Sequence, residues 1–153
     1  PDNRRPVDYA RRAATLDDAE LPALLAGWRD GRLKQYLIRT TLTLRREQPD
    51  LFAHGSYQAL TMEGTHSDRI VAFARTLGEA ACVVVVPRLV QPLLDSSDSL
   101  LPRDWGDTRL VLPEALQERP LRDRFGGRYW QEAGMALGQI LETFPVALYT
   151  VPD

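Results

Sequence analysis

The first third of the chain carries apolar residues at helical spacing. Four of them fall at i, i+3, i+4 and i+7, the pattern of one helix face: Leu21, Leu24, Leu25 and Trp28. The acidic pair Asp17-Asp18 is a candidate cap for this helix. Pro22 is tolerated near the start, because amides there lack intrahelical partners. We expect the helix to end at Gly27 or at Asp30-Gly31.

A second helix is predicted from about Leu33 to Gln48, where Pro49 stops it. Its main apolar stripe consists of Leu33, Tyr36, Leu37 and Leu44, whereas Ile38 and Leu42 point to the other side. A surface helix needs only one apolar face, so two faces indicate neighbours on both sides. We expect one neighbour to be the remainder of the chain and the other to be a body outside these 153 residues.

After Leu51-Phe52 the pattern changes to short β-branched or alternating runs. The predicted strands are Tyr57 to Met62, Arg69 to Arg75, Ala81 to Pro87, Thr108 to Leu112 and Val146 to Val151. The turns between them are marked by Glu63-Gly64, Leu77-Gly78 and Gly126-Gly127. Connections this short hold no crossover helix, so the strands should be antiparallel. The prediction is an α+β fold, with N-terminal helices followed by an antiparallel β-domain.

Two further runs refine this β-domain. The uninterrupted valines Val83 to Val86 are typical of a central strand that is covered on both faces. Leu137 to Phe144 is expected to form one or two helical turns, which Pro145 ends.

Composition excludes several classes of protein. The chain is long enough for one core, and 44% of its residues are hydrophobic. A net charge of −2 argues against a nucleic-acid binder. No apolar run approaches the roughly 20 residues of a membrane span. The chain starts at Pro1 without a secretory segment, so we expect a cytoplasmic protein and a piece cut from a longer one.

Residues for catalysis or metal binding are scarce. His54 and His66 are the only histidines, and Cys82 is the only cysteine. Cys82 heads a predicted strand, where we expect it to be packed and inert. Asp95 to Asp98 lacks the denser acidic spacing of a calcium loop. We therefore predict no metal site and no cofactor in this chain, and a catalytic Cys–His pair is not expected.

Two polar stretches remain as candidate binding elements. The first is the loop Asp2-Asn3-Arg4-Arg5, in which side chains that accept and donate hydrogen bonds could hold several hydroxyl groups. The second is the run Gly31 to Gln35, where Lys34 opens a helix. Taken alone, each stretch is more typical of a solvated loop or a helix start than of a binding site.

Blocks of sequence along nearly the whole chain support a more specific interpretation. They are Pro1 to Tyr9, Asp30 to Gln35, Leu44 to Phe52, Gly55 to Tyr57, Val71 to Arg75, Val86 to Arg88, Trp105 to Thr108 and Phe144 to Leu148. In this order they resemble maltooligosyltrehalose synthases, which belong to the α-amylase-like glycoside hydrolase superfamily. The blocks are sparser from Gln91 to Pro102 and from Arg119 to Ala136.

The resemblance implies a fold and a division of the chain. Such enzymes have a catalytic (β/α)8 barrel followed by a C-terminal antiparallel β-sandwich. Residues 1–53 would then be the last loop and helices of the barrel, and residues 54–153 the β-sandwich. This division also accounts for the helix with two apolar faces.

The resemblance also implies a reaction. These enzymes convert the reducing-end α-1,4 linkage of a maltooligosaccharide into an α,α-1,1 linkage by intramolecular glucosyl transfer. The two catalytic carboxyl groups would lie on earlier barrel strands, so the fragment alone should be inactive. In the intact enzyme its partners would be the maltooligosaccharide and the rest of the barrel, with neither nucleic acid nor membrane. We also expect self-association of the fragment through apolar surface left bare on its helices.

The implied substrate-binding residues are Asp2, Asn3, Arg4, Arg5 and Lys34. For Arg4 and Arg5 the alternative is an ion pair with barrel carboxylates, and for Lys34 it is packing against the barrel. Trp105 and Trp130 are candidates for stacking on glucose rings, whereas Trp28 is expected in the core. Two other interpretations stay open: a carbohydrate-binding module with exposed coplanar aromatic side chains, and a protein-interaction module with an exposed apolar patch on its sheet.

Overall fold

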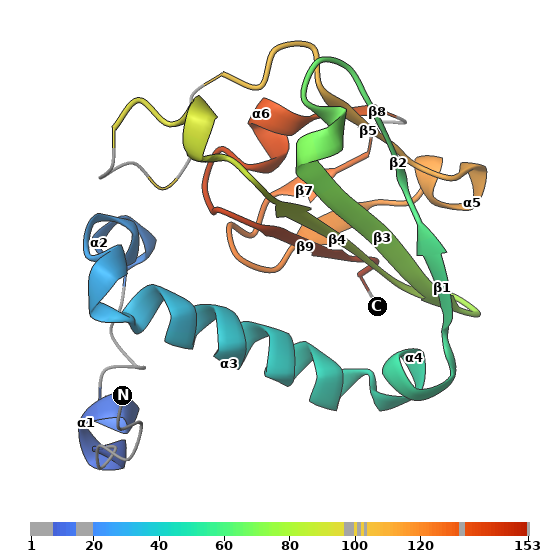
Figure 1. Cartoon of the computed structure of the whole chain (residues 1–153). Coiled ribbons are helices and arrows are strands. Elements are labelled where there is room, and N and C mark those ends of the chain that lie inside the picture. Colours follow the sequence, from blue (N-terminus) through green and yellow to red (C-terminus); the bar gives the residue numbers. More distant parts are fainter. Residues whose placement is uncertain are drawn as a thin grey trace. The chain divides into compact units, whose positions relative to one another are not determined.

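The structure is a computed structural model, and it describes residues 8–14, 20–96, 100, 102, 104–131 and 134–152. The chain divides into two compact units, residues 1–40 and 41–153 (Figure 1). Helix α3 (Arg32–Glu47) contains the boundary between them.

The first unit is helical, as the apolar spacing predicts. It contains α1 (Tyr9–Ala14), α2 (Leu21–Ala26), a 3-10 turn (Trp28–Asp30) and the start of α3. Pro22 lies in the first turn of α2, and the backbone N–H of Gly27 closes that helix by donating to the carbonyl oxygen of Ala23 at 3.0 Å. Gly31 adopts a φ of 88°, a left-handed conformation that glycine reaches without steric cost. The predicted caps Asp17 and Asp18 lie outside the described residues.

Helix α3 has the two apolar faces that its sequence predicts. Leu33 and Leu44 are buried, with exposed fractions of 7% and 1%. Ile38 and Leu42, on the other side, are 46% and 60% exposed. The helix ends at Glu47, next to the predicted boundary, and Pro49 then begins a separate short helix, α4 (Pro49–His54). Proline suits the first turn of a helix, so Pro49 stops one helix and starts the next.

The second unit contains two antiparallel sheets and no closed barrel among its described strands. The larger sheet has the order β1-β3-β4-β9-β6-β7, and the smaller has the order β2-β5-β8 (Figure 1). The strands are β1 (Ser56–Ala59), β2 (Thr61–Glu63), β3 (Ile70–Leu77), β4 (Ala80–Pro87), β5 (Arg109–Val111), β6 (Leu121–Asp123), β7 (Tyr129–Trp130), β8 (Gly134–Ala136) and β9 (Ala147–Thr150). The prediction of a mixed α+β fold with antiparallel strands is confirmed.

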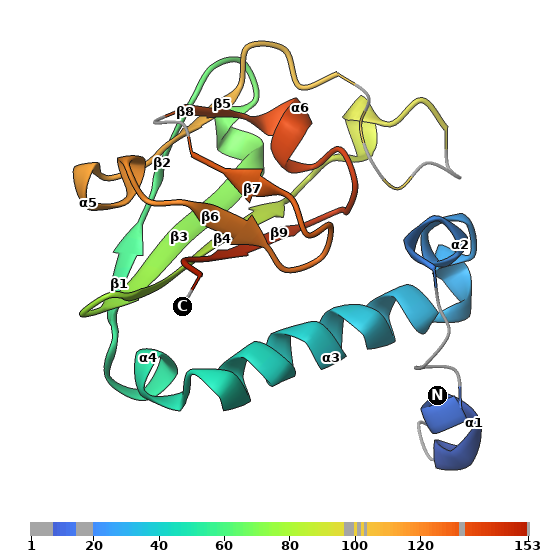
Figure 2. The ribbon, with the colours of Figure 1, turned by 180° about the vertical axis from the view of Figure 1, so that it is seen from behind.

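Several details of the β-region differ from the prediction. The run Tyr57 to Met62 is two strands, because the chain passes from the larger to the smaller sheet at Leu60. Strands β6, β7 and β8 and the short helix α5 (Glu114–Gln117) were not predicted. Figure 2 shows β6 and β7 beside β9, which is the strand that β6 pairs with. The short helix α6 (Leu137–Ile140) lies in the segment predicted to be helical.

One core serves both sheets. Val83 and Val85 from β4 belong to the same buried cluster as Leu110 from β5 and Met135 from β8, and all four are fully buried. Strand β4 is interior to its sheet, between β3 and β9, as its valine run predicts. On the opposite face of this strand Cys82 is fully buried, whereas Val84 and Val86 are only partly buried. That face is therefore covered over part of its length.

The covered part of this face lies near α4. Arg75 shares its side of the larger sheet with Cys82, its partner in β4. Its guanidinium group donates to the backbone carbonyl oxygens of Leu51, Phe52 and Gly55. The carboxylate of Glu47, at the end of α3, accepts from Arg124 at 2.6 Å. Residues 41–54 are thus tied to the sheets by charged hydrogen bonds from Arg75 of β3 and from Arg124 in the turn after β6.

Candidate functional site

Four of the five predicted binding residues lie close together near the start of the sequence. Asp2, Asn3, Arg4 and Arg5 lie outside the described residues, and the structure first describes Asp8. Their proposed contact with sugar hydroxyls therefore stays a prediction.

Lys34, the remaining predicted binding residue, lies in the first turn of α3 with its side chain exposed. The helix start around it is built by Asp30, whose carboxylate accepts from the backbone N–H of Arg32 at 2.9 Å and from its Nε at 2.7 Å. These hydrogen bonds lower the pKa of Asp30. The run Gly31 to Gln35 is thus an ordered helix start, which leaves Lys34 accessible to a partner or a ligand.

The tryptophan side chains offer little surface to a sugar. Trp105 is only 4% exposed and belongs to the main core, so its ring is not available for stacking on glucose. Trp130 packs against that core, and its indole N–H is buried without a hydrogen-bond acceptor among the described groups. Trp28 is partly buried, with the guanidinium carbon of Arg29 at 4.2 Å from its ring centroid. The exposed aromatic side chains of the second unit's described residues are instead Tyr57 and Tyr129.

The block Trp105 to Thr108 has a bracing role. The carboxylate of Asp107 accepts from the backbone N–H of Thr65 at 2.8 Å and from the Thr65 hydroxyl at 2.7 Å. These bonds lower the pKa of Asp107. The neighbouring hydroxyl of Thr108 accepts from the backbone N–H of His66 at 3.0 Å. The block therefore fixes the connection between β2 and β3 to the start of β5.

Arg75 forms a second brace, which sequence reasoning missed. Its Nη2 atom donates to the carbonyl oxygens of Phe52 at 3.1 Å and Gly55 at 2.9 Å, and its Nε donates to that of Leu51 at 3.3 Å. The last carbonyl groups of a helix lack intrahelical donors and carry partial negative charge. At the end of α4 the Arg75 guanidinium group supplies hydrogen-bond donors and a positive charge to these carbonyl groups.

The turn between β6 and β7 holds a buried acid that the sequence analysis did not single out. Asp123 is 5% exposed, and its carboxylate accepts from the backbone N–H groups of Phe125 and Gly126, both at 2.9 Å. Burial raises the pKa of Asp123. Burial also raises the pKa of the nearby Tyr149, and the negative charge of Asp123 adds to that increase. An acid followed by Gly126-Gly127 is a recognisable turn signal. Both groups are enclosed, which assigns them a structural role.

Other reactive groups do not assemble into a catalytic site in the described part of the chain. Cys82 is fully buried and burial raises its pKa, so the thiol stays protonated near neutral pH. Among the described residues no three histidine, cysteine or acidic side chains are grouped as metal ligands. Within the same residues, no helix has both the length and the apolar character to cross a membrane.

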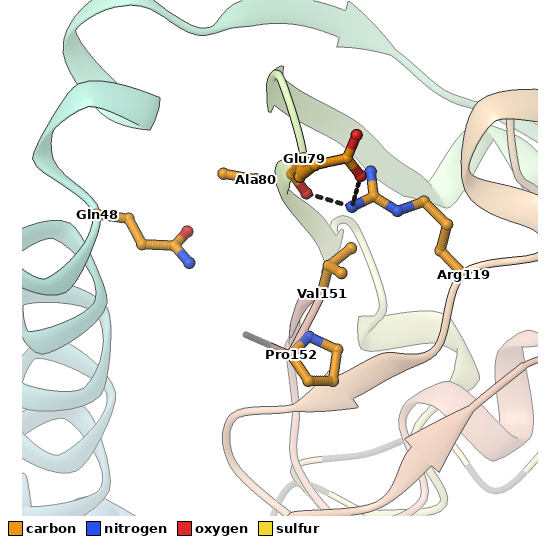
Figure 3. Close-up of a pocket in the computed structure, with 6 residues that line it drawn as sticks. All are labelled: Gln48, Glu79, Ala80, Arg119, Val151 and Pro152. Carbon is orange, nitrogen blue, oxygen red and sulfur yellow. Dashed lines mark hydrogen bonds and ion pairs between the residues drawn. The ribbon is translucent and has the colours of Figure 1, made fainter.

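One hollow of about 320 Å³ lies where the ends of several elements of the second unit meet (Figure 3). Its lining consists of Gln48, Glu79, Ala80, Arg119, Val151 and Pro152. Arg119 donates to the backbone carbonyl oxygen of Glu79 and, at 3.3 Å, to its carboxylate. The side-chain oxygen of Gln48 is buried, yet no described group donates to it. This combination of donors, acceptors and apolar wall could not be anticipated from the sequence, because its residues are widely separated along the chain.

Comparison with known proteins supplies the relationship that the geometry alone does not. No family model matches the chain. Two Mycobacterium tuberculosis proteins, from strains CDC 1551 and H37Rv, carry the provisional name maltooligosyl trehalose synthase and are each 32% identical to the chain over 114 residues. This chain is similar to part of a maltooligosyl trehalose synthase. The resemblance inferred from the sequence blocks is confirmed.

The similarity covers 74% of the chain but only 12% of each maltooligosyl trehalose synthase. The chain thus corresponds to a small part of these relatives.

Proposed function

We propose that this chain is the C-terminal part of a maltooligosyl trehalose synthase and supports the catalytic barrel of that enzyme. The observation that carries the proposal is the 32% identity over 114 residues with proteins of that name. The intact enzyme would convert the reducing-end α-1,4 linkage of a maltooligosaccharide into an α,α-1,1 linkage, an intramolecular glucosyl transfer that isomerises its substrate.

We further propose that residues 54–153 form a β-sandwich and that residues 1–53 complete the barrel. The core shared by the two sheets supports the first part. The exposure of Ile38 and Leu42 on the outer side of α3 supports the second, because large apolar side chains are usually covered by a partner surface. In this arrangement residues 41–53 hold the two parts together through Arg75 and Arg124.

The chemistry assigns the reactive groups to the rest of the enzyme. A retaining glycosyl transfer needs a carboxylate nucleophile and a second carboxyl group that acts first as acid and then as base. Two enclosed acid-base groups of the described chain, Asp123 and Tyr149, are inside the fold, where Asp123 holds a turn. The contribution of the chain to catalysis would be the loop Asp2-Asn3-Arg4-Arg5 and Lys34 as substrate-binding groups at the barrel mouth.

A chimera tests the proposal. The matched 114-residue segment of the Mycobacterium relative is deleted and then replaced by the corresponding residues of this chain. The relative, the deletion variant, the chimera and the 153-residue chain alone are then assayed for loss of reducing ends from maltopentaose. We expect activity from the relative and the chimera, and none from the deletion variant or the chain alone. A chimera that folds but is inactive would contradict the supporting role, and turnover by the chain alone would contradict the placement of the catalytic groups.

A second candidate function, a carbohydrate-binding module, has one observation in its favour. Tyr57 is 62% exposed, and its ring centroid lies 5.0 Å from that of Phe73 with 31° between the ring planes. Exposed aromatic rings of this kind can stack on sugar faces. Calorimetric titration of the chain with maltopentaose, compared with Tyr57→Ala, tests this alternative: heat that disappears in the variant supports it, and heat that persists contradicts it.

A further inference from the structure

The hollow beside Gln48 contains an unsatisfied polar group. The side-chain oxygen of Gln48 is buried and accepts no hydrogen bond from a described group. A buried acceptor without a donor is costly, and native proteins almost always supply a partner. Figure 3 shows the Gln48 amide directed toward the hollow, so the missing donor belongs there.

The opposite wall supplies complementary groups. Arg119 uses its Nη2 atom for both contacts with Glu79, and its Nε and Nη1 N–H groups remain for other acceptors. Its side chain is 23% exposed, whereas that of Glu79 is fully exposed. The Gln48 amide can present either its oxygen or its NH2 group by rotation. A molecule between these walls would therefore meet donors and acceptors on both sides.

Charge and shape narrow the ligand class. The Glu79 carboxylate beside the Arg119 guanidinium leaves no net charge in this pair, which favours a neutral ligand over an anion. Ala80, Val151 and Pro152 add an apolar wall that suits C–H groups. A volume of about 320 Å³ lies at the lower end of small-molecule sites, roughly 300 to 1,000 Å³.

We propose that this hollow binds a small neutral polyhydroxylated molecule of the size of one sugar ring. One hydroxyl donates to the Gln48 side-chain oxygen and another accepts from a remaining N–H group of Arg119, while the ring carbons lie against Val151 and Pro152. This site is independent of the loop Asp2 to Arg5 and takes no part in the glucosyl transfer proposed above.

Nuclear magnetic resonance of the ¹⁵N-labelled chain tests the site. Glucose, maltose and gluconate are titrated separately, and the side-chain NH2 signal of Gln48 is identified by its loss in Gln48→Leu. We expect saturable shifts of this signal and of the Ala80 and Val151 backbone amides with glucose or maltose, at millimolar dissociation constants. Gluconate carries similar hydroxyls with a negative charge and should bind more weakly.

Matched variants separate binding from folding. Gln48→Leu should weaken binding about tenfold. The shifts of the Ala80 and Val151 backbone amides measure this change. The variant should not have a lower melting temperature, because the amide oxygen has no described donor to lose. The control Gln139→Leu changes an exposed glutamine of α6 and should leave binding unchanged.

Three outcomes would overturn the proposal: no saturable shift with any sugar, which would assign the donor at Gln48 to water; equal binding by Gln48→Leu; or tighter binding of gluconate than of glucose. The titration requires no catalysis. Its failure would leave the chimera experiment unaffected, and an inactive chimera would leave the titration interpretable.

Discussion

Asp107 holds Thr65 through two hydrogen bonds, although 42 positions separate them along the chain. The carboxylate accepts both the backbone N–H and the hydroxyl of Thr65. Gly64 makes the close approach possible: a Cβ atom there would lie 2.7 Å from the carbonyl oxygen of Asp107, and the φ of Gly64 is +95°. This joint between Asp107 and Thr65 therefore depends both on the Asp107 carboxylate and on a glycine at position 64.

The joint predicts a pH-dependent loss of stability in Asp107→Asn. Hydrogen bonds from Thr65 lower the pKa of Asp107 in the folded chain, so its ionised form stabilises the fold above the unfolded pKa of about 3.9. That contribution disappears as the pH falls through the lower folded pKa. In urea unfolding the wild type should be more stable than the variant at pH 7, and this difference in the free energy of unfolding should shrink as the pH is lowered to 3. A constant difference across this range would contradict the electrostatic origin.

Asp123 should show the opposite pH dependence. Burial raises its pKa in the folded state, so the contribution of its protonated form is fully present below the unfolded pKa of about 3.9 and is lost as the pH rises through the folded value. The amide group introduced by Asp123→Asn does not ionise, so the stability of this variant relative to wild type should improve from pH 3 to pH 7. The same urea titrations measure this trend, and a decline over that range would exclude burial as the dominant cause.

Gly126 is predicted to resist substitution for a local reason. A Cβ atom at this position would lie 2.7 Å from the Asp123 Oδ2 atom and 2.9 Å from the Thr143 hydroxyl. The carboxylate cannot retreat without losing its bonds to the backbone N–H groups of Phe125 and Gly126. Gly126→Ala should lower the free energy of unfolding by about 1–3 kcal/mol.

The matched control is Gly138→Ala. Gly138 lies in α6, and an added Cβ atom would meet nothing within 4 Å. This variant should be neutral or more stable by up to about 1 kcal/mol. Equal destabilisation of the two variants in thermal unfolding would show that crowding at Asp123 is not the cause.

Local patterns predicted the parts of the fold that depend on local spacing. The stripes of α3 and the alternation of β3 are visible over many consecutive residues, so both elements lie near their predicted positions. Strand β6 is only three residues long, and two of them, Arg122 and Asp123, are charged. It is a strand because β9 pairs with it, and that pairing is not encoded in its own periodicity.

The candidate site was less predictable for a related reason. Asp30 and Arg32 are two positions apart, so the helix start at Lys34 can be inferred from short-range chemistry. The closure of α4 by Arg75 joins residues at least 20 positions apart, and nothing near Arg75 in the sequence indicates those carbonyl groups. For Trp105 the sequence alone leaves open whether this loop residue stacks on sugars or packs inside the protein, and the fold places it in the core.

Arg75 should be among the residues on which the attachment of α4 depends most. Arg75→Met keeps much of the aliphatic stem but removes the donors to Leu51, Phe52 and Gly55. Losing charged hydrogen bonds at a partly buried site should cost about 2–3 kcal/mol of unfolding free energy. Hydrogen exchange of residues 49–55 should accelerate in the variant. The control Arg122→Met alters an exposed arginine of β6 and should change neither quantity; similar effects in both would contradict a specific brace.

The exposed side of α3 predicts concentration-dependent self-association of the isolated chain, as a consequence of the proposal that the intact enzyme covers this side. Leu42 is 60% exposed, and Ile38 follows the same face of the helix at 46%. Burying two such side chains against a second copy removes apolar surface from water. Leu42→Gln should therefore lower the weight-average mass in sedimentation equilibrium. Leu77→Gln, at a leucine of β3 that is 39% exposed, should leave that mass unchanged. A wild-type chain that stays monomeric at high concentration would argue against a covering partner for α3, because the bare face would then be stable in water.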